Sequence, residues 1–318
     1  MRAGTTLLVA TPGGHIDELY ELAPRLAEVG THRIWVTAQT AQTEHLLGDE
    51  EVVWVPGVGS RQGLRALSSI PAAMAAMRTH RPRLIVSTGA ALSVPYLWSA
   101  RVHGIPTHYI ESATRLHGPS ITGRVMERTL GVVKHHQGFV ASRSGWNDLG
   151  SVFDGYGSAP QTHRSAGNVV VTVGTERFPF QRILTSVASA LPSTVDVVWQ
   201  TGHTPSTELP GTVRAWIPHN ELQAAVERAD IVVTHAGVGS VLMALRCGRH
   251  PLILPRRAAL GEHVDDHQVE LARHLEQRGL ATVASPDDDL AELILESTRY
   301  RTVHAEGAPL HLNVRTPD

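Results

Sequence analysis

The sequence feature that most constrains the fold is a repeated alternation of short apolar runs and amphipathic stretches. The runs are mostly apolar throughout, which is typical of parallel strands covered by helices on both faces. The same order returns after a segment at 155–168 that is rich in turn-forming residues. Two such rounds predict an α/β protein with two Rossmann-like parallel-sheet domains facing a cleft. We expect strands at 5–11, 33–38, 51–56, 83–89, 106–112, 169–174, 195–202, 213–217, 231–237, 251–255 and 281–284.

The chain length of 318 residues suits two domains. We expect an N-terminal domain over 1–160, a C-terminal domain over 168–300, and a loose tail over 301–318, where no periodicity is seen. Apolar residues share one helical face over 15–30, where Gly30 can end the helix and Pro24 would kink it.

Composition excludes several classes of protein. A formal net charge of −2 gives no electrostatic support for nucleic-acid binding. The single cysteine, Cys247, excludes an internal disulfide and fits a reducing compartment. The longest uncharged stretch, 84–100, contains serines, a threonine, a glycine and a proline, so it favours strand, loop and helix over a membrane span. The N-terminal stretch has no signal-peptide pattern, so we expect a cytoplasmic protein.

Ligands of open α/β sheets bind beyond the carboxyl ends of the strands, so the loops that follow strands hold the candidate residues. The first is "VATPGGHIDEL", where the backbone of Gly13 and Gly14 can approach a phosphate. His15 follows as a candidate general base. Asp17 either orients His15 or stabilises the first helical turn. The alternative is a tight turn with a solvated histidine.

The second loop is "HYIESATRLHGPSITGR". Glu111 ends an apolar strand and is either a general base or a helix cap. Arg115 and Arg124 can bind phosphate through charge-assisted hydrogen bonds. The plainer interpretation pairs Glu111 with an arginine.

The third loop is "THAGVGSVLMALRCG" at 234–248. Gly237, Gly239 and Ser240 begin a helix whose terminal N–H groups suit a diphosphate, and His235 can donate to it. Leu242 stands where a G-x-G-x-x-G motif needs its third glycine, so dinucleotide binding is disfavoured.

A polar run follows within "PRRAALGEHVDDHQVELARHL". His263, Asp266, His267 and Gln268 resemble metal ligands, and the two histidines are four residues apart. No third ligand with a matching supporting shell is evident, so we expect no metal. We expect Asp266 and Gln268 to bind sugar hydroxyls instead.

These motifs together resemble a known enzyme family. "VGTERFPFQRIL" and 234–275 resemble the donor-binding half of family 28 glycosyltransferases. "TPGGHIDELYEL", "STGAALSVPYL" and "YIESATRLHGPSITGR" resemble its acceptor-binding partner subunit in the split dolichol N-acetylglucosaminyltransferase. Bacterial exopolysaccharide N-acetylglucosaminyl- or glucuronosyltransferase subunits share the "PRR…GEHVDDHQ" run. Both halves stand in one chain over about residues 5 to 295, in the order of the lipid II-forming peptidoglycan glycosyltransferase.

The resemblance implies a GT-B fold and inverting, metal-independent transfer from a nucleotide sugar, a UDP-sugar first of all. The acceptor would be a polyprenyl-diphosphate-linked sugar in cell-surface polysaccharide synthesis. It implies that the catalytic base is His15 or Glu111, with Gly13, Gly14 and Arg115 on the acceptor side. It places the donor diphosphate at Thr175, His235, Gly237, Gly239 and Ser240, and the donor sugar at Asp266 and Gln268.

Met243 departs from the family pattern. Members usually have a glutamate there that binds the ribose hydroxyls of UDP, and methionine cannot accept those bonds. Related enzymes that use dTDP-sugars also have an apolar residue there, so a dTDP donor stays open. The alternative is that another residue binds the ribose.

Residues 60–83 raise the question of membrane contact. A face with several arginines there either rests on anionic lipid at the inner face of the membrane or packs as an ordinary helix on the sheet. The apolar members of that face are Leu64, Leu67, Ile70, Met74 and Met77, and the basic ones are Arg61, Arg65 and Arg78.

Four rival functions stay open beside this one. One is a glycosyltransferase that tailors a small metabolite. A nucleotide-sugar 2-epimerase would need no acceptor, so the acceptor-side loop at 108–124 argues against it. An NAD-dependent oxidoreductase lacks both its glycine motif and an acidic residue after the second strand. A noncatalytic scaffold is disfavoured because His15 and Glu111 are both present.

Overall fold

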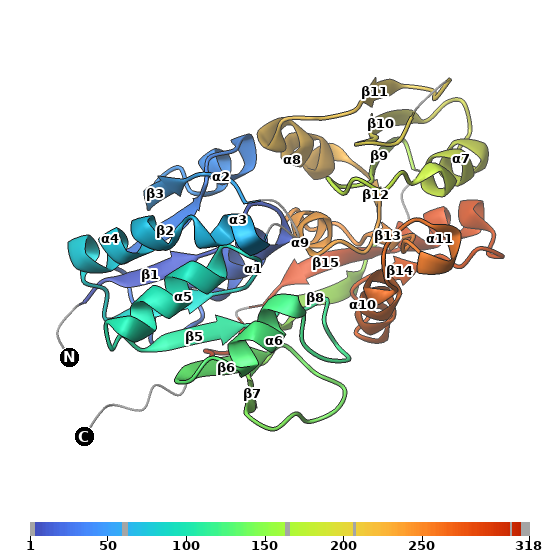
Figure 1. Ribbon diagram of the computed structural model, residues 1–318. Coiled ribbons are helices and arrows are strands. Elements are labelled where there is room, and N and C mark those ends of the chain that lie inside the picture. Colours follow the sequence, from blue (N-terminus) through green and yellow to red (C-terminus); the bar gives the residue numbers. More distant parts are fainter. Residues whose placement is uncertain (1–3, 59–62, 163–165, 206–207, 306, 313–318) are drawn as a thin grey trace. The chain divides into compact units, whose positions relative to one another are not determined.

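The computed structural model describes residues 4–58, 63–162, 166–205, 208–305 and 307–312. The chain divides into two compact units, one made of 1–154 with 307–318 and the other of 155–306 (Figure 1). Each unit contains its own parallel sheet with helices, so the predicted pair of Rossmann-like sheets is confirmed.

The N-terminal unit is built on a seven-stranded sheet of order β3-β2-β1-β4-β5-β6-β7. All neighbouring strands are parallel. The order reverses between β1 and β4, which is the arrangement that opens a binding crevice at the carboxyl ends of those strands. The strands are β1 (Thr6–Val9), β2 (Arg33–Ala38), β3 (Glu51–Val55), β4 (Leu84–Ser87), β5 (Thr107–Ile110), β6 (Val132–His136) and β7 (Trp146–Asp148).

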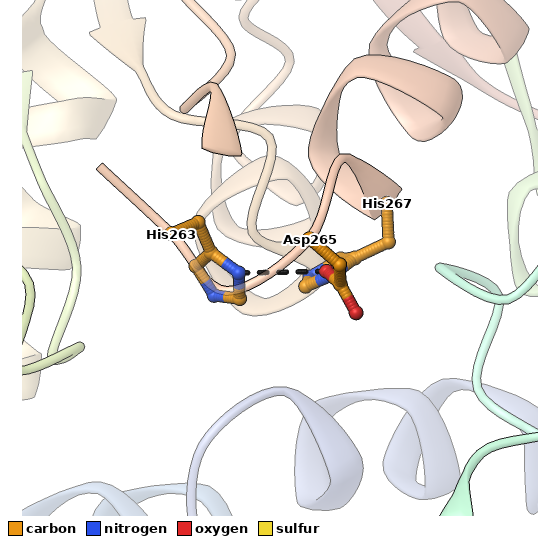
Figure 2. Close-up of side chains that lie close together, drawn as sticks. All are labelled: His263, Asp265 and His267. Carbon is orange, nitrogen blue, oxygen red and sulfur yellow. Dashed lines mark hydrogen bonds and ion pairs between the residues drawn. The ribbon is translucent and has the colours of Figure 1, made fainter. Parts of the chain in front are cut away.

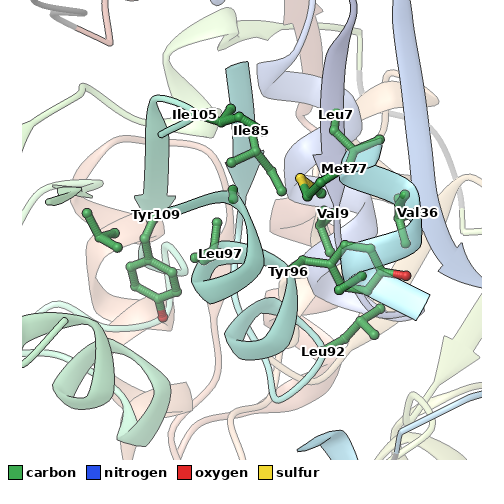
Figure 3. Packing of buried hydrophobic residues seen from close by; sticks show 14 of the residues in the cluster. Leu7, Val9, Val36, Met77, Ile85, Leu92, Tyr96, Leu97, Ile105 and Tyr109 are labelled. Atoms are coloured by element: carbon green, nitrogen blue, oxygen red, sulfur yellow. The ribbon is translucent and has the colours of Figure 1, made fainter. Parts of the chain in front are cut away.

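Helices cover this sheet, and their apolar faces build its core. Leu7, Val9 and Ile85 of the central strands pack with Tyr96 and Met77 of the helices (Figure 3). The helices are α1 (Gly14–Leu22), α2 (Ala41–Leu46), α3 (Gly63–Leu67), α4 (Ile70–His80), α5 (Ser93–Val102) and α6 (Ile121–Glu127).

One helix differs from the sequence prediction. α1 ends at Leu22, and the expected continuation to Gly30 is wrong. Pro24 has no N–H to donate to the helix, so the chain leaves it in turns.

The C-terminal unit is built on a six-stranded parallel sheet of order β11-β10-β9-β12-β13-β14. Its core forms around β9 and β12, with Phe180, Leu184 and Trp199 fully buried. The strands are β9 (Asn168–Thr172), β10 (Asp196–Gln200), β11 (Thr212–Arg214), β12 (Ile231–Thr234), β13 (Leu252–Ile253) and β14 (Thr282–Val283). The helices are α7 (Gln181–Ala190), α8 (His219–Arg228), α9 (Val238–Arg246), α10 (His267–Gln277) and α11 (Leu290–Ser297), with a 3₁₀ turn at Ala258–Leu260.

The expected tail over 301–318 is wrong for its first residues. β15 (Tyr300–His304) pairs antiparallel with β8 (Tyr156–Pro160), so its backbone groups are satisfied in a ladder. Because β8 belongs to this pair, the N-terminal unit ends at 154 rather than at 160. Leu310 exchanges backbone hydrogen bonds with Arg25 and Ala27 and is part of the N-terminal unit.

All eleven predicted strands are present, each at or within its expected range to one residue. Within the part of the chain that the structure describes, four further strands were not predicted, namely β6, β7, β8 and β15. Among the described residues, no helix has both the length and the apolar character needed to cross a membrane.

Candidate functional site

His15 lies in the first turn of α1, after the carboxyl end of β1. Its Nδ1 is 2.9 Å from the carbonyl oxygen of Thr88, and the Thr88 hydroxyl donates back to the His15 carbonyl at 2.7 Å. A carbonyl only accepts, so Nδ1 carries the proton and Nε2 keeps the lone pair in the neutral ring. Burial lowers the pKa of His15, opposed by the bond to Thr88 and aided by the nearby Arg115 cation. The residue is therefore a neutral imidazole with a free basic nitrogen at neutral pH.

The glycine turn before α1 is held by α2. Gly13 has φ of 95°, which favours glycine, and its N–H donates to Gln42 Oε1 at 2.7 Å. Nε2 of the Gln42 side chain in turn donates to the buried carboxylate of Asp17 at 2.8 Å. Asp17 therefore fixes the turn through Gln42, whereas the Thr88 carbonyl orients His15. Gly14 is the first residue of α1.

Glu111 follows β5 and is 1% exposed. Its Oε2 accepts from the N–H and hydroxyl of Ser120 at 2.9 and 3.1 Å, and its Oε1 accepts from the Tyr109 hydroxyl and the Ser112 N–H at 3.2 Å each. A Cβ on Gly123 would lie 2.2 Å from Oε2, so the backbone packs directly against the carboxylate. Burial raises the pKa of Glu111 against these hydrogen bonds. The carboxylate is enclosed and its acceptor sites are occupied.

Glu18 is a second buried carboxylate, which sequence reasoning missed. It lies on α1, one turn after His15, and accepts from the Ser112 hydroxyl at 2.6 Å, the Ala113 N–H at 3.0 Å and Gln137 at 2.8 Å. Burial raises the pKa of Glu18 to about 7. These bonds join α1 to the loop after β5. The spacing of His15 and Glu18 on one helical face was the available signal.

The two predicted phosphate-binding arginines differ in exposure. Arg115 is half-buried, and its backbone N–H donates to the Ser112 carbonyl. Its positive charge contributes to the lowered pKa of His15. Arg124 is an exposed residue of α6. The structure thus brings His15 and Arg115 together.

In the C-terminal unit, His235 follows β12 and lies between two glycines. It is 5% exposed, and Cβ atoms built on Gly174 and Gly237 would lie 2.3 and 2.2 Å from its ring. No larger residue fits at either position without displacing the imidazole. Burial, aided by the Arg256 cation, lowers the pKa of His235 to about 3, so the ring is neutral. Its Nδ1 is 3.4 Å from the Thr234 hydroxyl.

The predicted diphosphate residues gather at the same sheet edge. Gly237 is the N-cap of α9, and Gly239 and Ser240 lie half-buried in its first turn. Thr175 is exposed in the loop after β9, the strand that pairs with β12. A helix N-terminus with unpaired N–H groups beside exposed hydroxyls is suited to a diphosphate.

Arg256 joins the two loops at this edge, and sequence reasoning gave it no role. Its guanidinium is fully buried and donates to the carbonyls of Phe178 at 2.7 Å, Val173 at 3.0 Å and Glu262 at 3.2 Å. It also lies over the Phe180 ring. Burial lowers the pKa of Arg256 to about 10, so it stays charged. A buried cation thus fixes the loop after β9 against the loop after β13.

The two residues expected to bind the donor sugar hold their own loop. Asp266 accepts from the Ala258 N–H at 2.8 Å, and Gln268 accepts from the Arg256 N–H at 3.2 Å. Gln268 is 2% exposed. Each side chain has a second polar atom that these bonds leave available.

Met243 lies on α9, one turn beyond Ser240. It is 7% exposed and packs with Leu222 and Val226 of α8 and Val232 of β12. Its environment is apolar, which fits a residue that does not bind hydroxyls.

The face expected at 60–83 falls partly outside the described residues, as do Arg61 and the side chain of Leu64. Met77 is buried in the core of the unit, and Ile70 and Met74 are half-buried. Leu67 is exposed, as are Arg65 and Arg78.

Comparison with known proteins agrees with this arrangement. Residues 168–309 match the family model described as the glycosyltransferase family 28 C-terminal domain. The chain has the GT-B fold, and its C-terminal unit matches the family 28 glycosyltransferases.

Among curated proteins, it is similar to the UDP-N-acetylglucosamine–N-acetylmuramyl-(pentapeptide) pyrophosphoryl-undecaprenol N-acetylglucosamine transferase of Xylella fastidiosa, with 28% identity over 92% of this chain and 85% of the relative. It is also similar to UDP-N-acetylglucosamine transferase subunit ALG13 of Yarrowia lipolytica, with 35% identity over 22% of this chain and 34% of the relative.

Among solved structures, the chain resembles the glycosyltransferase SsfS6 from Streptomyces sp. SF2575 complexed with thymidine diphosphate. The TM-score is 0.54 at 17% identity, covering 93% of this chain and 95% of that one. At this identity the similarity shows the fold alone. The predicted fold is thereby confirmed, and the match to the family 28 model gives no support to the epimerase and oxidoreductase alternatives.

Proposed function

We propose that this protein is an inverting glycosyltransferase that moves a sugar from a nucleotide diphosphate to a hydroxyl of a polyprenyl-diphosphate-linked sugar. The observation that carries the proposal is a neutral histidine base in one unit and a neutral histidine beside a helix N-terminus in the other. The Xylella fastidiosa relative, matched over most of both chains, is named for such a donor and acceptor.

We assign the base to His15. The acceptor hydroxyl gives its proton to Nε2 and attacks the anomeric carbon, while the nucleotide diphosphate leaves from the opposite face. The Thr88 carbonyl holds the tautomer that this step needs. Glu111 is the weaker candidate because its acceptor sites are occupied. We assign it, with Glu18, to positioning the acceptor-side loop that carries Arg115.

We assign the leaving diphosphate to the N-terminus of α9 with His235 and Thr175. The negative charge that develops there is stabilised by the N–H groups of Gly239 and Ser240. His235 is neutral, so it contributes a hydrogen bond rather than a full charge. These donors support transfer without a metal ion. Asp266 and Gln268 orient the donor sugar through the polar atoms that their loop bonds leave available.

A UDP-sugar is the first choice of donor, because both curated relatives carry UDP-N-acetylglucosamine in their names. Met243 supports a dTDP-sugar as the alternative, since its apolar packing provides no acceptor for ribose hydroxyls. SsfS6, of the same fold, is complexed with thymidine diphosphate.

The Met243→Glu variant tests this choice. If UDP is the donor nucleotide and no other residue binds its ribose, the new carboxylate should lower KM for the UDP-sugar by about tenfold, the value of one charged hydrogen bond. A dTDP enzyme would instead gain nothing and shift its preference toward UDP. Steady-state kinetics with both donors measures it, and Met243→Leu is the size-matched control.

A lipid-linked acceptor requires work at a membrane surface, and we propose peripheral contact from the cytoplasmic side. The exposed Leu67, Arg65 and Arg78 support contact through the region 60–83. Met77 is buried in the core, so fewer apolar residues of this region are available for membrane contact than the sequence pattern predicts.

The proposed function is tested by release of nucleotide diphosphate from UDP- and dTDP-sugars, with and without polyprenyl-diphosphate-sugar acceptors. We expect release to depend on the lipid-linked acceptor. Release with a small aromatic or macrolide acceptor alone would place the protein among the metabolite-tailoring enzymes instead.

A further inference from the structure

The loop before α10 places three metal-ligating side chains together. His263, Asp265 and His267 each direct one ligand atom inward, and all these atoms lie within 4.8 Å of one another (Figure 2). The Asp265 carboxylate contacts both rings, at 3.5 Å from Nδ1 of His263 and in a short contact with Nδ1 of His267. The sequence pattern gave no evident third ligand, and we expected no metal there. The structure places Asp265 beside the two histidines, whereas the Asp266 carboxylate accepts from the Ala258 N–H.

Hydrogen bonding within the chain leaves this cluster incompletely satisfied. Nδ1 of His263 is buried and has no hydrogen-bond partner among the described residues. A single carboxylate oxygen lies between two imidazole nitrogens, and only the His267 nitrogen reaches hydrogen-bond distance. A dication at this point would engage both ring lone pairs and the carboxylate oxygen at once.

The charged and aromatic neighbours of the cluster have contacts of their own. The Arg256 guanidinium is committed to backbone carbonyls, and the Phe178 ring lies 5.4 Å from the His263 ring.

We propose that His263, Asp265 and His267 bind one first-row transition-metal dication of the Zn²⁺ class. Two imidazoles and one carboxylate form the donor set that such ions favour over Mg²⁺ or Ca²⁺. Three protein ligands leave a fourth coordination position open to water. The ion fixes the loop that carries Asp266 and Gln268, and the proposed transfer does not require it.

Metal binding is measured on the purified full-length protein without donor or acceptor. After chelator treatment, we expect one equivalent of Zn²⁺ to bind in competition with a chromogenic chelator, and Co²⁺ to give a visible d–d band. Asp265→Asn keeps the shape of the side chain but loses its charge, and with His267→Gln it should weaken Zn²⁺ binding by at least about tenfold. Since the readout involves no sugar transfer, failure here and failure of the proposed function are distinguishable.

His274→Gln is the matched control, because His274 lies on the same helix, about two turns beyond His267. It should bind Zn²⁺ as the wild type does. Circular dichroism of the metal-free variants verifies that each is folded. Wild-type protein that binds no Zn²⁺, or folded Asp265→Asn and His267→Gln variants that bind as tightly as wild type, would overturn the proposal.

Discussion

At the scale of single residues, hydrogen bonding separates the two candidate bases. Nδ1 of His15 is committed to a carbonyl, which leaves Nε2 as a basic atom without a partner among the described residues. Glu111 has the opposite character, since four donors from its own loop and strand surround it. A base must have a free lone pair directed at its substrate, and this condition favours His15.

The pH dependence of transfer follows from the environment of His15. Its pKa lies below the ordinary 6.5, so the free base persists as the pH falls below that value. We expect the acid limb of kcat/KM to lie below pH 6.5. Arg115→Gln removes a like charge and should move that limb to higher pH. An acid limb above pH 6.5 in the wild type would contradict the assignment.

At the scale of elements, the decisive features are the loops after β1, β4, β5, β9, β12 and β13. Sequence patterns located these loops because buried parallel strands are continuous apolar runs, such as Ile231–Thr234. They did not locate β6, because "VVKHH" has only two apolar residues and gains its place by pairing with β5. The sequence pattern also failed to predict β15, because this strand depends on pairing with β8, which is over 130 residues earlier in the chain.

Among the site residues, those carried by motifs were found and those defined by burial were not. His15 and Gly237 stand in recognisable turns before helices. Arg256 follows a strand, where an arginine suggests a surface ligand, and only tertiary packing encloses it. In the sequence, Glu18 has the pattern of an ordinary polar helix residue. Its burial depends on the loop after β5, which covers it in the structure.

The role of Arg256 can be tested through stability. Arg256→Met keeps an apolar stem over Phe180 but leaves the carbonyls of Val173 and Phe178 without their donor. We expect the free energy of unfolding of the C-terminal unit to fall by about 3 kcal/mol, given the value of hydrogen bonds from charged groups. Urea denaturation measures it. Arg273→Met, at an exposed position of α10, should change it by less than about 0.5 kcal/mol. If both variants lower the free energy of unfolding by the same amount, Arg256 does not stabilise the unit through these hydrogen bonds.

At the scale of the whole molecule, both units enclose neutral histidines within parallel-sheet cores. In the N-terminal unit, Nδ1 of His108 lies 2.9 Å from Nε2 of His135, and burial lowers their pKa values to about 4 and about 3. In the C-terminal unit, His235 has a pKa of about 3 for the same reason. Acid therefore lowers the free energy of unfolding of both units.

The sign of the effect follows from linkage. These histidines are neutral when folded but have pKa values near 6.5 when unfolded, so the unfolded chain takes up protons first. Stability is complete above pH 6.5 and is lost as the pH falls toward 4, by up to about 1.4 kcal/mol per pH unit for each such histidine. Melting temperatures at pH 7.5, 6 and 5 should fall in that order. The His108→Gln/His135→Gln variant should show a shallower fall, and an unchanged slope would exclude the pair as a cause.

The most direct test of the central claim compares the rate of sugar transfer to a polyprenyl-diphosphate-sugar by wild type, His15→Gln and Glu111→Gln at saturating donor. General-base catalysis contributes roughly 10² to 10⁴ in rate. We therefore predict that His15→Gln loses at least 10² in kcat while nucleotide binding stays unchanged, and that Glu111→Gln loses less and mainly raises KM for the acceptor. A His15→Gln enzyme that transfers at the wild-type rate, or a folded Glu111→Gln enzyme that loses as much kcat as His15→Gln, would contradict the account.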